Sequence, residues 1–462
     1  MTEQTSYHPV IGIDLGTTSC TMSVWNGSEP VVIPDPLPSV VAQNAAGQIV
    51  VGHRPDGDAQ PVIAGIKREL GSDERVRLRG RQYRPPEICA FLLIELKRQA
   101  EAFLDGPVHD AVITVSGSAG EPQRRAIREA AGLAQLNVRR LLDDPVAAAV
   151  ALGTDDRERT YAIYDLGGGT FETAIVRINA EGVAVLGGAG DPRLGGDDFD
   201  EHITGYALRQ IRERHHVDLS RDDDVRTRIR REAELRKCEL STADATVLEL
   251  PLLTATVSAN VPLSRRVFEA MIEPDVTKSL GHLTAALAFA EAEHGIGRDG
   301  VDQVVLAGCS TRIPAVRERL AGYFSLGPGD IRTDLEPGHL NALGAGLIAR
   351  EFEPAVTFEG SRPGLLGANL RLRAEMADPS PAVPSPSPLG PPDLLPGVPA
   401  ETPADFRGVA DAAHSILARD GARPALRAAY LSFIAAVHAA APDARLAELG
   451  ALLTSELARA SS

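Results

Sequence analysis

Two short segments of the chain carry residue types suited to binding a polyphosphate. Each places Asp-Leu-Gly after an apolar run and follows it with small residues: IGIDLGTTSCTMSV at 11–24 and AIYDLGGGTFETAIV at 162–176. Glycine-rich turns allow backbone N–H groups to close on an anion. The hydroxyls of Thr17, Thr18 and Thr170 would add further donors, so each segment predicts a phosphate-gripping hairpin.

Asp14 and Asp165 stand at the mouths of these turns, where a naked carboxylate would repel phosphates. The two acids therefore predict a divalent cation, or its bound waters, between them and the polyphosphate. Mg²⁺ fits because it keeps several waters and uses few carboxylates. One such turn is explained by a structural role alone. The repetition, with TT in one copy and GGGT in the other, favours a facing pair of phosphate-binding hairpins.

Short strand-like runs alternate with longer helix-compatible patterns up to about residue 350. The strand-like runs are VIGIDLG, DAVITVSG, TYAIYDLGGG, FETAIVRI and DQVVLAG, and the helical patterns lie at 87–103, 121–133 and 222–240. Alternation of this kind is typical of an α/β body. The repeated Asp-Leu-Gly hairpin further predicts that the body consists of two duplicated halves.

Composition excludes several classes of partner and compartment. The net charge is −16 and no basic block occurs, so the sequence predicts no nucleic-acid partner. The four cysteines are scattered without CxxC spacing, which predicts reduced, individually buried thiols. No run of about 18 apolar residues and no basic-then-apolar N-terminal segment is present, so we expect no membrane partner and a cytoplasmic protein.

A change in composition near residue 375 separates this body from the rest of the chain. Ten of the 25 residues from 379 to 403 are proline, which predicts a semi-rigid linker at 375–403. Apolar residues then recur at helical spacing in three groups, so residues 404–460 predict a small three-helix module. Its apolar stripes are explained by the module's own core, and a partner-binding groove remains the alternative.

Six segments in order resemble the nucleotide-binding motifs of the DnaK (heat shock protein 70) chaperone family: IGIDLGTTSC, AGIKRELG, DLGGGTFET, LGGDDFDEHI, EAELRKCELS and LAGCSTRIPAVRERL. The resemblance covers roughly residues 9–350. It implies an actin-like ATPase fold, in which two lobes with ribonuclease-H-like cores surround an ATP cleft. Lobe I would span 9–155 and lobe II 156–350, with a closing helix at about 340–350 that returns to lobe I.

The resemblance assigns roles around the phosphates. Asp14 and Asp165 would orient the waters of Mg²⁺, and Lys67 and Asp144 would position the attacking water. The residues that would bind the phosphates of ATP or ADP through backbone or hydroxyl groups are Gly16, Thr17, Thr18, Gly167, Gly168, Gly169, Thr170, Gly195 and Gly196. Hydrolysis of this kind depends mostly on positioning and electrostatics.

The adenosine end of the nucleotide would lie against two segments of lobe II. Glu234, Lys237 and Ser241 are spaced at i, i+3 and i+7, which predicts that they share one helical face. By resemblance this face binds the ribose and the adenine. A second segment, with Gly308, Ser310 and Arg312, would form the opposite wall, with the guanidinium stacked on the base.

Several positions depart from the family pattern near the nucleotide. Asp143, Asp144 and Pro145 replace Asn-Glu-Pro, so the water-organising carboxylate is one methylene shorter. Glu172 replaces the usual Asp, and Cys309 replaces the second glycine of the adenosine loop. None of these changes removes a cradle made of backbone groups, so we expect ATP binding to be retained and turnover to be slow.

Two further departures concern coupling to the rest of the protein. Ser116 stands where the family has a proline that relays the nucleotide state. Gly338, which replaces an Asp after a proline, belongs with the departures near the nucleotide. After residue 350 no acidic Asp-Leu-Leu-Leu linker and no β-rich peptide-binding stretch follow. We therefore expect an altered relay and no ordinary peptide-binding domain.

These features predict a Mg²⁺-dependent, slowly ATP-hydrolysing, chaperone-related protein in which lobe closure signals to a partner. A J-domain co-chaperone, a nucleotide exchange factor and an unknown partner of the C-terminal helices are the expected partners. The alternative is a nucleotide-gated scaffold with little or no hydrolysis. A sugar kinase on the same fold is a third option, which no feature of the sequence demands.

Overall fold

The computed structural model describes residues 9–352, except 45, 54–61, 79, 154–156, 326–329 and 333–334, together with residues 412, 451, 453 and 454. The predicted linker and nearly all of the predicted C-terminal module lie outside these residues. The chain divides into two compact units, and the first comprises Met1–Val41 and Val51–Arg373. Both large sheets and the candidate site belong to this first unit.

The described strands are β1 (Val10–Asp14), β2 (Ser19–Trp25), β3 (Pro30–Pro38), β4 (Val40–Gln43), β5 (Ile49–Val51), β6 (Val62–Ala64), β7 (Val76–Leu78), β8 (Arg81–Tyr83), β9 (Asp110–Val115), β10 (Asn137–Asp143), β11 (Arg159–Leu166), β12 (Phe171–Asn179), β13 (Gly182–Asp191), β14 (Ala245–Leu250), β15 (Ala259–Ser264), β16 (Gln303–Ala307) and β17 (Ile331–Arg332). The α-helices are α1 (Pro85–Leu104), α2 (Glu121–Leu133), α3 (Asp144–Ala151), α4 (Gly196–His215), α5 (Asp223–Glu239), α6 (Arg265–His294), α7 (Pro314–Phe324) and α8 (Leu340–Ala349). Short 3-10 helices are η1 (Ile66–Glu69), η2 (Arg298–Gly300), η3 (Cys309–Arg312) and η4 (Arg350–Phe352). The helices expected at 87–103, 121–133 and 222–240 are confirmed as α1, α2 and α5.

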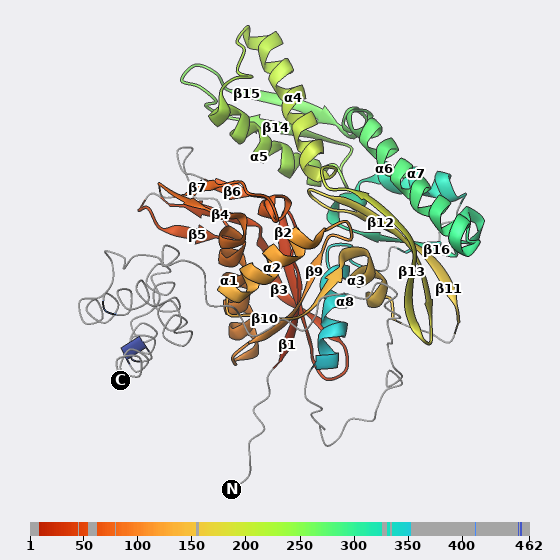
Figure 1. Cartoon of the computed structure of the whole chain (residues 1–462). Helices are drawn as coiled ribbons and strands as arrows, with labels where there is room; N and C mark the ends of the chain where they lie inside the picture. The colour runs from red at the N-terminus through yellow and green to blue at the C-terminus, as the bar shows by residue number, and fades with distance from the viewer. Residues whose placement is uncertain are drawn as a thin grey trace. The chain divides into compact units, whose positions relative to one another are not determined.

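Two five-stranded sheets have the same topology (Figure 1). The first has the order β10-β9-β1-β2-β3 and the second the order β13-β12-β11-β16-β17. In each, the first three strands form an antiparallel meander, and two later strands add in parallel beside the first of them. The duplication predicted from the repeated hairpin is therefore confirmed. We call the first sheet with η1, α1 and α2 lobe I, and the second sheet with α4–α7 lobe II.

Parallel strands end at the same edge of a sheet, so the candidate site residues that follow these strands lie close together. In lobe I the strands β1, β9 and β10 end at Asp14, Val115 and Asp143. In lobe II the strands β11 and β16 end at Leu166 and Ala307. Both Asp-Leu-Gly turns and the loop before η3 consequently follow strand ends that lie together within each sheet.

The helices α3 and α8 lie between the two sheets (Figure 1). One buried cluster contains apolar side chains of both sheets and of both helices. Small residues allow this close packing, since a Cβ atom on Gly344 would overlap the carbonyl of Ala147 and one on Gly12 would overlap the backbone of Gly346. At these two contacts, which we call the seam between the lobes, the backbones pack directly against each other.

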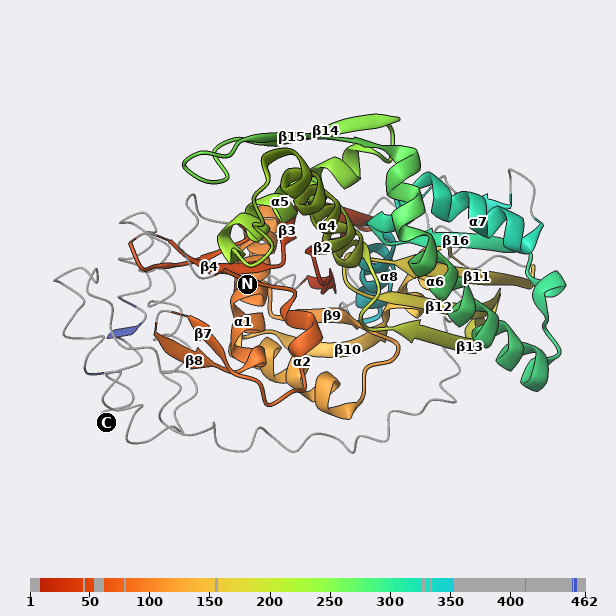
Figure 2. The same ribbon diagram turned by 90° about the horizontal axis from the view of Figure 1, so that it is seen from above.

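Lobe II carries an additional layer. Figure 2 shows α4 and α5 beside the β14–β15 hairpin, and α6 along the β12–β13 side of the second sheet. A single apolar core joins these elements, with Phe171, Phe199 and Phe268 fully buried in it. No helix among the described residues is long and apolar enough to cross a membrane.

All four cysteines are free thiols, but the prediction that each is buried is wrong for two of them. Cys20 and Cys89 lie in the core of lobe I, whereas Cys238 and Cys309 are exposed. The exposed pair lies on α5 and η3, at the surface where the sequence predicts adenosine binding. Burial raises the pKa of the Cys20 thiol to about 11, which keeps it protonated at neutral pH.

The close packing at the seam predicts an asymmetry between two glycine-to-alanine substitutions. Gly344→Ala should destabilise the protein by about 1–3 kcal/mol because its Cβ has no space against Ala147. Gly132→Ala in α2 meets nothing within 4 Å and should be neutral or stabilising by up to about 1 kcal/mol. Urea denaturation of the two variants measures the difference, and equal midpoints would contradict this description of the seam.

Candidate active site

The two Asp-Leu-Gly turns face one another across the lobes, as the sequence repeat predicts. A Cβ atom on Gly168 would overlap the side chain of Thr18, and one on Gly169 would overlap that of Thr17. The first turn is stabilised by a hydrogen bond that the Ser39 hydroxyl donates to the Gly16 carbonyl at 2.7 Å. Only glycine allows the second turn to approach the threonines this closely.

Donors of lobe II hold the carbonyl groups of the triple glycine. The Gly167 oxygen accepts from the Gly196 N–H at 3.1 Å and from the Ser310 hydroxyl at 2.9 Å. The Gly168 oxygen accepts from the Asp197 N–H at 2.6 Å. Both N–H donors belong to the first turn of α4, where helix N–H groups have no partner within the helix.

Holding these carbonyls fixes the opposite edge of the turn, because the C=O and N–H of a trans peptide point in opposite directions. Among the residues that the structure describes, nothing accepts a hydrogen bond from the N–H of Gly168, Gly169 or Thr170. Backbone N–H groups that have no partner within the protein are available to an outside acceptor such as water or an anion. Three consecutive free N–H groups form a cradle suited to a phosphate oxygen.

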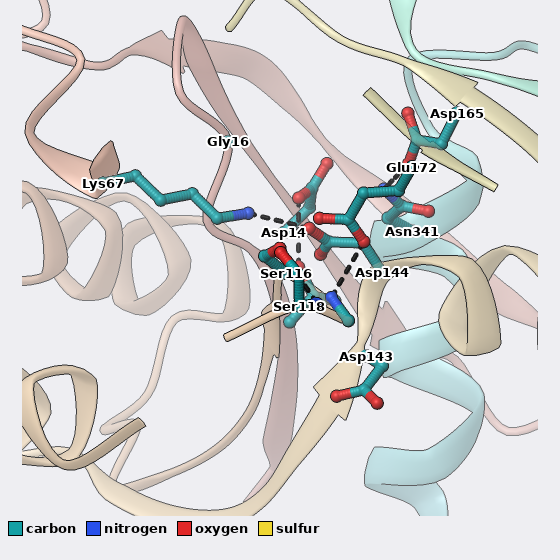
Figure 3. Close-up of polar contacts among 12 residues, drawn as sticks. Asp14, Gly16, Lys67, Ser116, Ser118, Asp143, Asp144, Asp165, Glu172 and Asn341 are labelled. Carbon is teal, nitrogen blue, oxygen red and sulfur yellow. Dashed lines mark hydrogen bonds and ion pairs between the residues drawn. The ribbon is translucent and has the colours of Figure 1, made fainter. Parts of the chain in front are cut away.

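Four carboxyl groups surround one amine beside these turns (Figure 3). Lys67 is 5% exposed, and its Nζ lies 2.8 Å from Asp144 Oδ2. Asp14, Asp165 and Glu172 complete the group, and Asp165 and Glu172 are direct cross-strand partners on β11 and β12. With one ammonium for four acids, the cluster carries excess negative charge unless some acids are protonated or a cation is present.

The electrostatics of the cluster follow from burial and crowding. Burial and the neighbouring Asp144 raise the pKa of Asp14 to about 7 and that of Glu172 to about 8. Burial and Asp144 likewise raise the pKa of Asp165 to about 6. Burial alone would lower the pKa of Lys67, but Asp144 and Asp14 raise it above its ordinary value. The lysine therefore remains charged.

Two polar side chains that the sequence reasoning did not select orient the predicted metal-site acids. The Thr114 hydroxyl donates to Asp14 Oδ1 at 3.1 Å, and Asn341 Nδ2 donates to Asp165 Oδ2 at 2.9 Å. Asn341 lies in the otherwise apolar helix α8, LNALGAGLIA, and is 8% exposed. The sequence signal that could have identified Asn341 is that it is the single amide side chain among small apolar residues.

The two departures at Glu172 and Ser116 meet in space. Glu172 Oε2 accepts from the Gly117 N–H at 2.8 Å, so β12 of lobe II contacts the loop after β9 in lobe I. The Ser116 hydroxyl lies 2.8 Å from that of Ser118. Asp143 points away from the cluster in Figure 3 and pairs with Arg124 at 2.6 Å. The interlobe contact at this loop is thus polar.

Several buried polar atoms in and beside the cluster have no hydrogen-bond partner among the residues that the structure describes. They are Thr17 Oγ1, Asp144 Oδ1, Glu172 Oε1 and Asn341 Oδ1. Within the described ranges no three His, Cys, Asp or Glu side chains are arranged to bind a metal ion directly. Buried acceptor oxygens of carboxyl groups that lack a protein partner suit a cation that retains its waters. The site therefore fits hydrated Mg²⁺ together with a phosphate chain.

Lys237 and Gly308 lie on the predicted adenosine side. Lys237 Nζ donates to the Gly196 carbonyl at 2.9 Å and to Asp200 Oδ2 at 2.8 Å. The helix α5 ends at Glu239, so Ser241 lies in the turn beyond it and not on the helical face with Glu234 and Lys237. Gly308 has φ +76°, and a Cβ there would lie 2.6 Å from Asp165 Oδ1, which restricts the position to glycine.

Arg312 and Ser241 line a cavity of about 400 Å³ with Glu336 and Pro337. Glu336 forms an ion pair with the Arg312 guanidinium and raises the pKa of that group. Cys309 and Gly338 share one space, since a Cβ on Gly338 would lie 2.9 Å from Cys309 Sγ. The two departures noted separately in the sequence therefore compensate each other.

The model of the Hsp70 protein family matches residues 57–359, more than half of the chain. The chain belongs to the Hsp70 family. Its repeated sheets are accordingly the two cores of an actin-like ATPase fold, and it is a chaperone-related, ATP-binding protein. The Hsp70 match begins at residue 57, after the first Asp-Leu-Gly turn. That turn joins β1 to β2, which occupy the same places in the first sheet as β11 and β12 occupy in the second.

The buried acids of this Hsp70 protein predict a pH-dependent stability without nucleotide or metal. A carboxyl whose folded pKa is raised contributes stability at low pH that is lost as the pH rises through the folded pKa. Wild-type stability should therefore fall between pH 5 and pH 8. Glu172→Gln should lessen that fall by roughly 1 kcal/mol per pH unit, the value for one proton.

Urea denaturation in the presence of a chelator, at several pH values, measures this slope. Exposed Glu181→Gln is the control and should keep the wild-type slope. Identical slopes for wild type and Glu172→Gln would show that Glu172 is ionised throughout the range.

Proposed function

We propose that this chain binds ATP with Mg²⁺ and hydrolyses it slowly to ADP and phosphate. The observation that carries the proposal is the pair of facing turns, one with three free N–H groups, beside a buried Lys67–Asp144 pair. Phosphoryl transfer to water needs little covalent chemistry from a protein, and positioned charges and donors suffice. Membership of the Hsp70 family supports this reaction over sugar phosphorylation.

The phosphate side of the site would divide its tasks among few residues. Asp14 and Asp165 would hold Mg²⁺ through its waters, with Thr114 and Asn341 fixing their orientation. When bound, Mg²⁺ supplies neutralisation of the charge shared by the β- and γ-phosphates. The N–H groups of Gly168, Gly169 and Thr170, with the hydroxyls of Thr17, Thr18 and Thr170, would bind phosphate oxygens.

Lys67 and Asp144 would position the attacking water. The ammonium is fixed by Asp144 Oδ2, while Asp144 Oδ1 has no partner and is an acceptor suited to a water proton. The Lys67 charge also opposes the negative charge that develops in the reaction. Slow turnover follows if the short Asp144 side chain keeps Lys67 close to itself and away from the phosphates.

We further propose that Glu234, Lys237, Ser241, Gly308, Ser310 and Arg312 form the adenosine side of the cleft. The position of Arg312 on the wall of the cavity with Ser241 supports this assignment. Ser310 would act indirectly, since its hydroxyl is bound to the Gly167 carbonyl. Gly195 and Gly196 would allow the start of α4 to pack closely against the phosphate turn.

Lobe closure around the nucleotide would be the output of the reaction. Closure would change the surface offered to a J-domain co-chaperone, to a nucleotide exchange factor or to a partner of residues 404–460. The polar contact between Glu172 and the loop after β9 supports communication between the lobes without the family's proline.

Replacing the buried lysine should separate hydrolysis from binding. Lys67→Ala should lower single-turnover hydrolysis of labelled ATP by on the order of 100-fold while ATP affinity changes much less. Lys97→Ala, at a half-buried lysine of α1 that donates to the Gln135 carbonyl, is the matched control. Equal, near-background rates in wild type and Lys67→Ala would favour a nucleotide-gated scaffold over an ATPase.

The glycine cradle predicts loss of binding when its space is filled. Gly168→Ala should weaken ATP affinity by about tenfold or more, because a Cβ there displaces Thr18 and the free N–H groups. Gly188→Ala in β13, where the Cβ meets only the Thr173 carbonyl at 3.6 Å, should bind normally. Calorimetry with ATP and Mg²⁺ measures both, and unchanged affinity in Gly168→Ala would exclude this cradle as the phosphate site.

A further inference from the structure

One carbonyl of the triple glycine is held from the opposite lobe. The Gly169 oxygen accepts from Arg68 Nε at 3.1 Å and from Arg68 Nη2 at 2.5 Å. Arg68 belongs to η1 of lobe I, directly after Lys67, and its side chain is 26% exposed. Gly167 and Gly168 are bound by donors of lobe II, so Arg68 is the described side chain that joins this turn to lobe I.

The same guanidinium extends the connection to the helices of lobe II. Arg68 Nη2 lies 3.3 Å from Asp197 Oδ2, in the first turn of α4. The other oxygen of Asp197 lies 3.6 Å from Arg230 on α5, the helix that carries Glu234 and Lys237. One arginine thus reaches the phosphate turn directly and the predicted adenosine helix through one carboxylate.

The turn is shaped to receive this arginine. A Cβ on Gly169 would lie 2.6–2.7 Å from the guanidinium nitrogens, so a larger residue would displace Arg68. Hydrogen bonds that involve an ionised group are stronger than neutral ones, and two from one planar group also fix direction. Because the Gly169 carbonyl points to Arg68, the Thr170 N–H of the same peptide is directed the opposite way.

We propose that Arg68 is a positioning residue that fastens the phosphate turn of lobe II to lobe I, so that ordering the turn and closing the lobes are one event. The inference rests on the proposed nucleotide binding. Its consequence is slow nucleotide release, since the lobes part only when the bonds to the Gly169 carbonyl and Asp197 break. Lys67, one residue earlier, is carried into place by the same short helix.

The test is a double-mutant cycle on the full-length chain with Arg68→Gln, Asp197→Asn and the double variant. Stopped-flow release of a fluorescent ADP should be about tenfold faster in Arg68→Gln, the effect of losing charged hydrogen bonds. Asp197→Asn should show a smaller acceleration, and the double variant should resemble Arg68→Gln because Asp197 acts through the arginine. Arg84→Gln, which breaks an ion pair with Glu129 within lobe I, should release ADP at the wild-type rate.

Arg68→Lys keeps the charge with a single donor group and should give an intermediate rate, which also serves if Arg68→Gln folds poorly. Release at the wild-type rate in both Arg68 variants would overturn the proposal. Additive effects of Arg68→Gln and Asp197→Asn would also overturn it, because Asp197 would then act through Arg230 and not through Arg68. Release is measured without turnover, so a failure of hydrolysis in the Lys67 comparison is distinguishable from either outcome.

Discussion

The ammonium group of Lys67 lies among four buried or half-buried carboxyl groups, and much of the local structure balances that charge. Asp144 binds the amine directly, Thr114 and Asn341 donate to the two acids that flank the cleft, and the Gly117 N–H donates to Glu172. Removing the ammonium costs several kcal/mol, because the carboxylates would then remain buried and uncompensated. The elements that supply these residues come from both lobes, so this charge balance also fixes how the sheets meet.

The features that depend on backbone geometry could be predicted from the sequence. A repeated hairpin after an apolar strand has few structural solutions, and the duplicated sheets follow from it. The glycines of the second turn were selected for anion binding, and the opposing threonines leave no space for a Cβ on Gly168 or Gly169. Local periodicity likewise located α1, α2 and α5, since amphipathic helices carry their own signal.

Contacts that side chains make across the lobes could not be predicted from local sequence patterns. Asn341 lies 176 residues from Asp165, and Arg68 lies 101 residues from Gly169. Neither pair has a spacing that a single sequence could show. Ser241 was wrongly grouped with Glu234 and Lys237 from its spacing alone, although the helix expected at 222–240 ends before it, as α5 does. The exposure of Cys238 and Cys309 was missed because spacing says nothing of which side a thiol faces.

The glycine seam has a mechanical consequence. With Gly344 against Ala147 and Gly12 against Gly346, α8 touches α3 on one side and β1 on the other at backbone distance. Such close contact strongly resists separation or sliding of α8 against α3 and β1. The seam is therefore the place where the two lobes are least free to shift against each other.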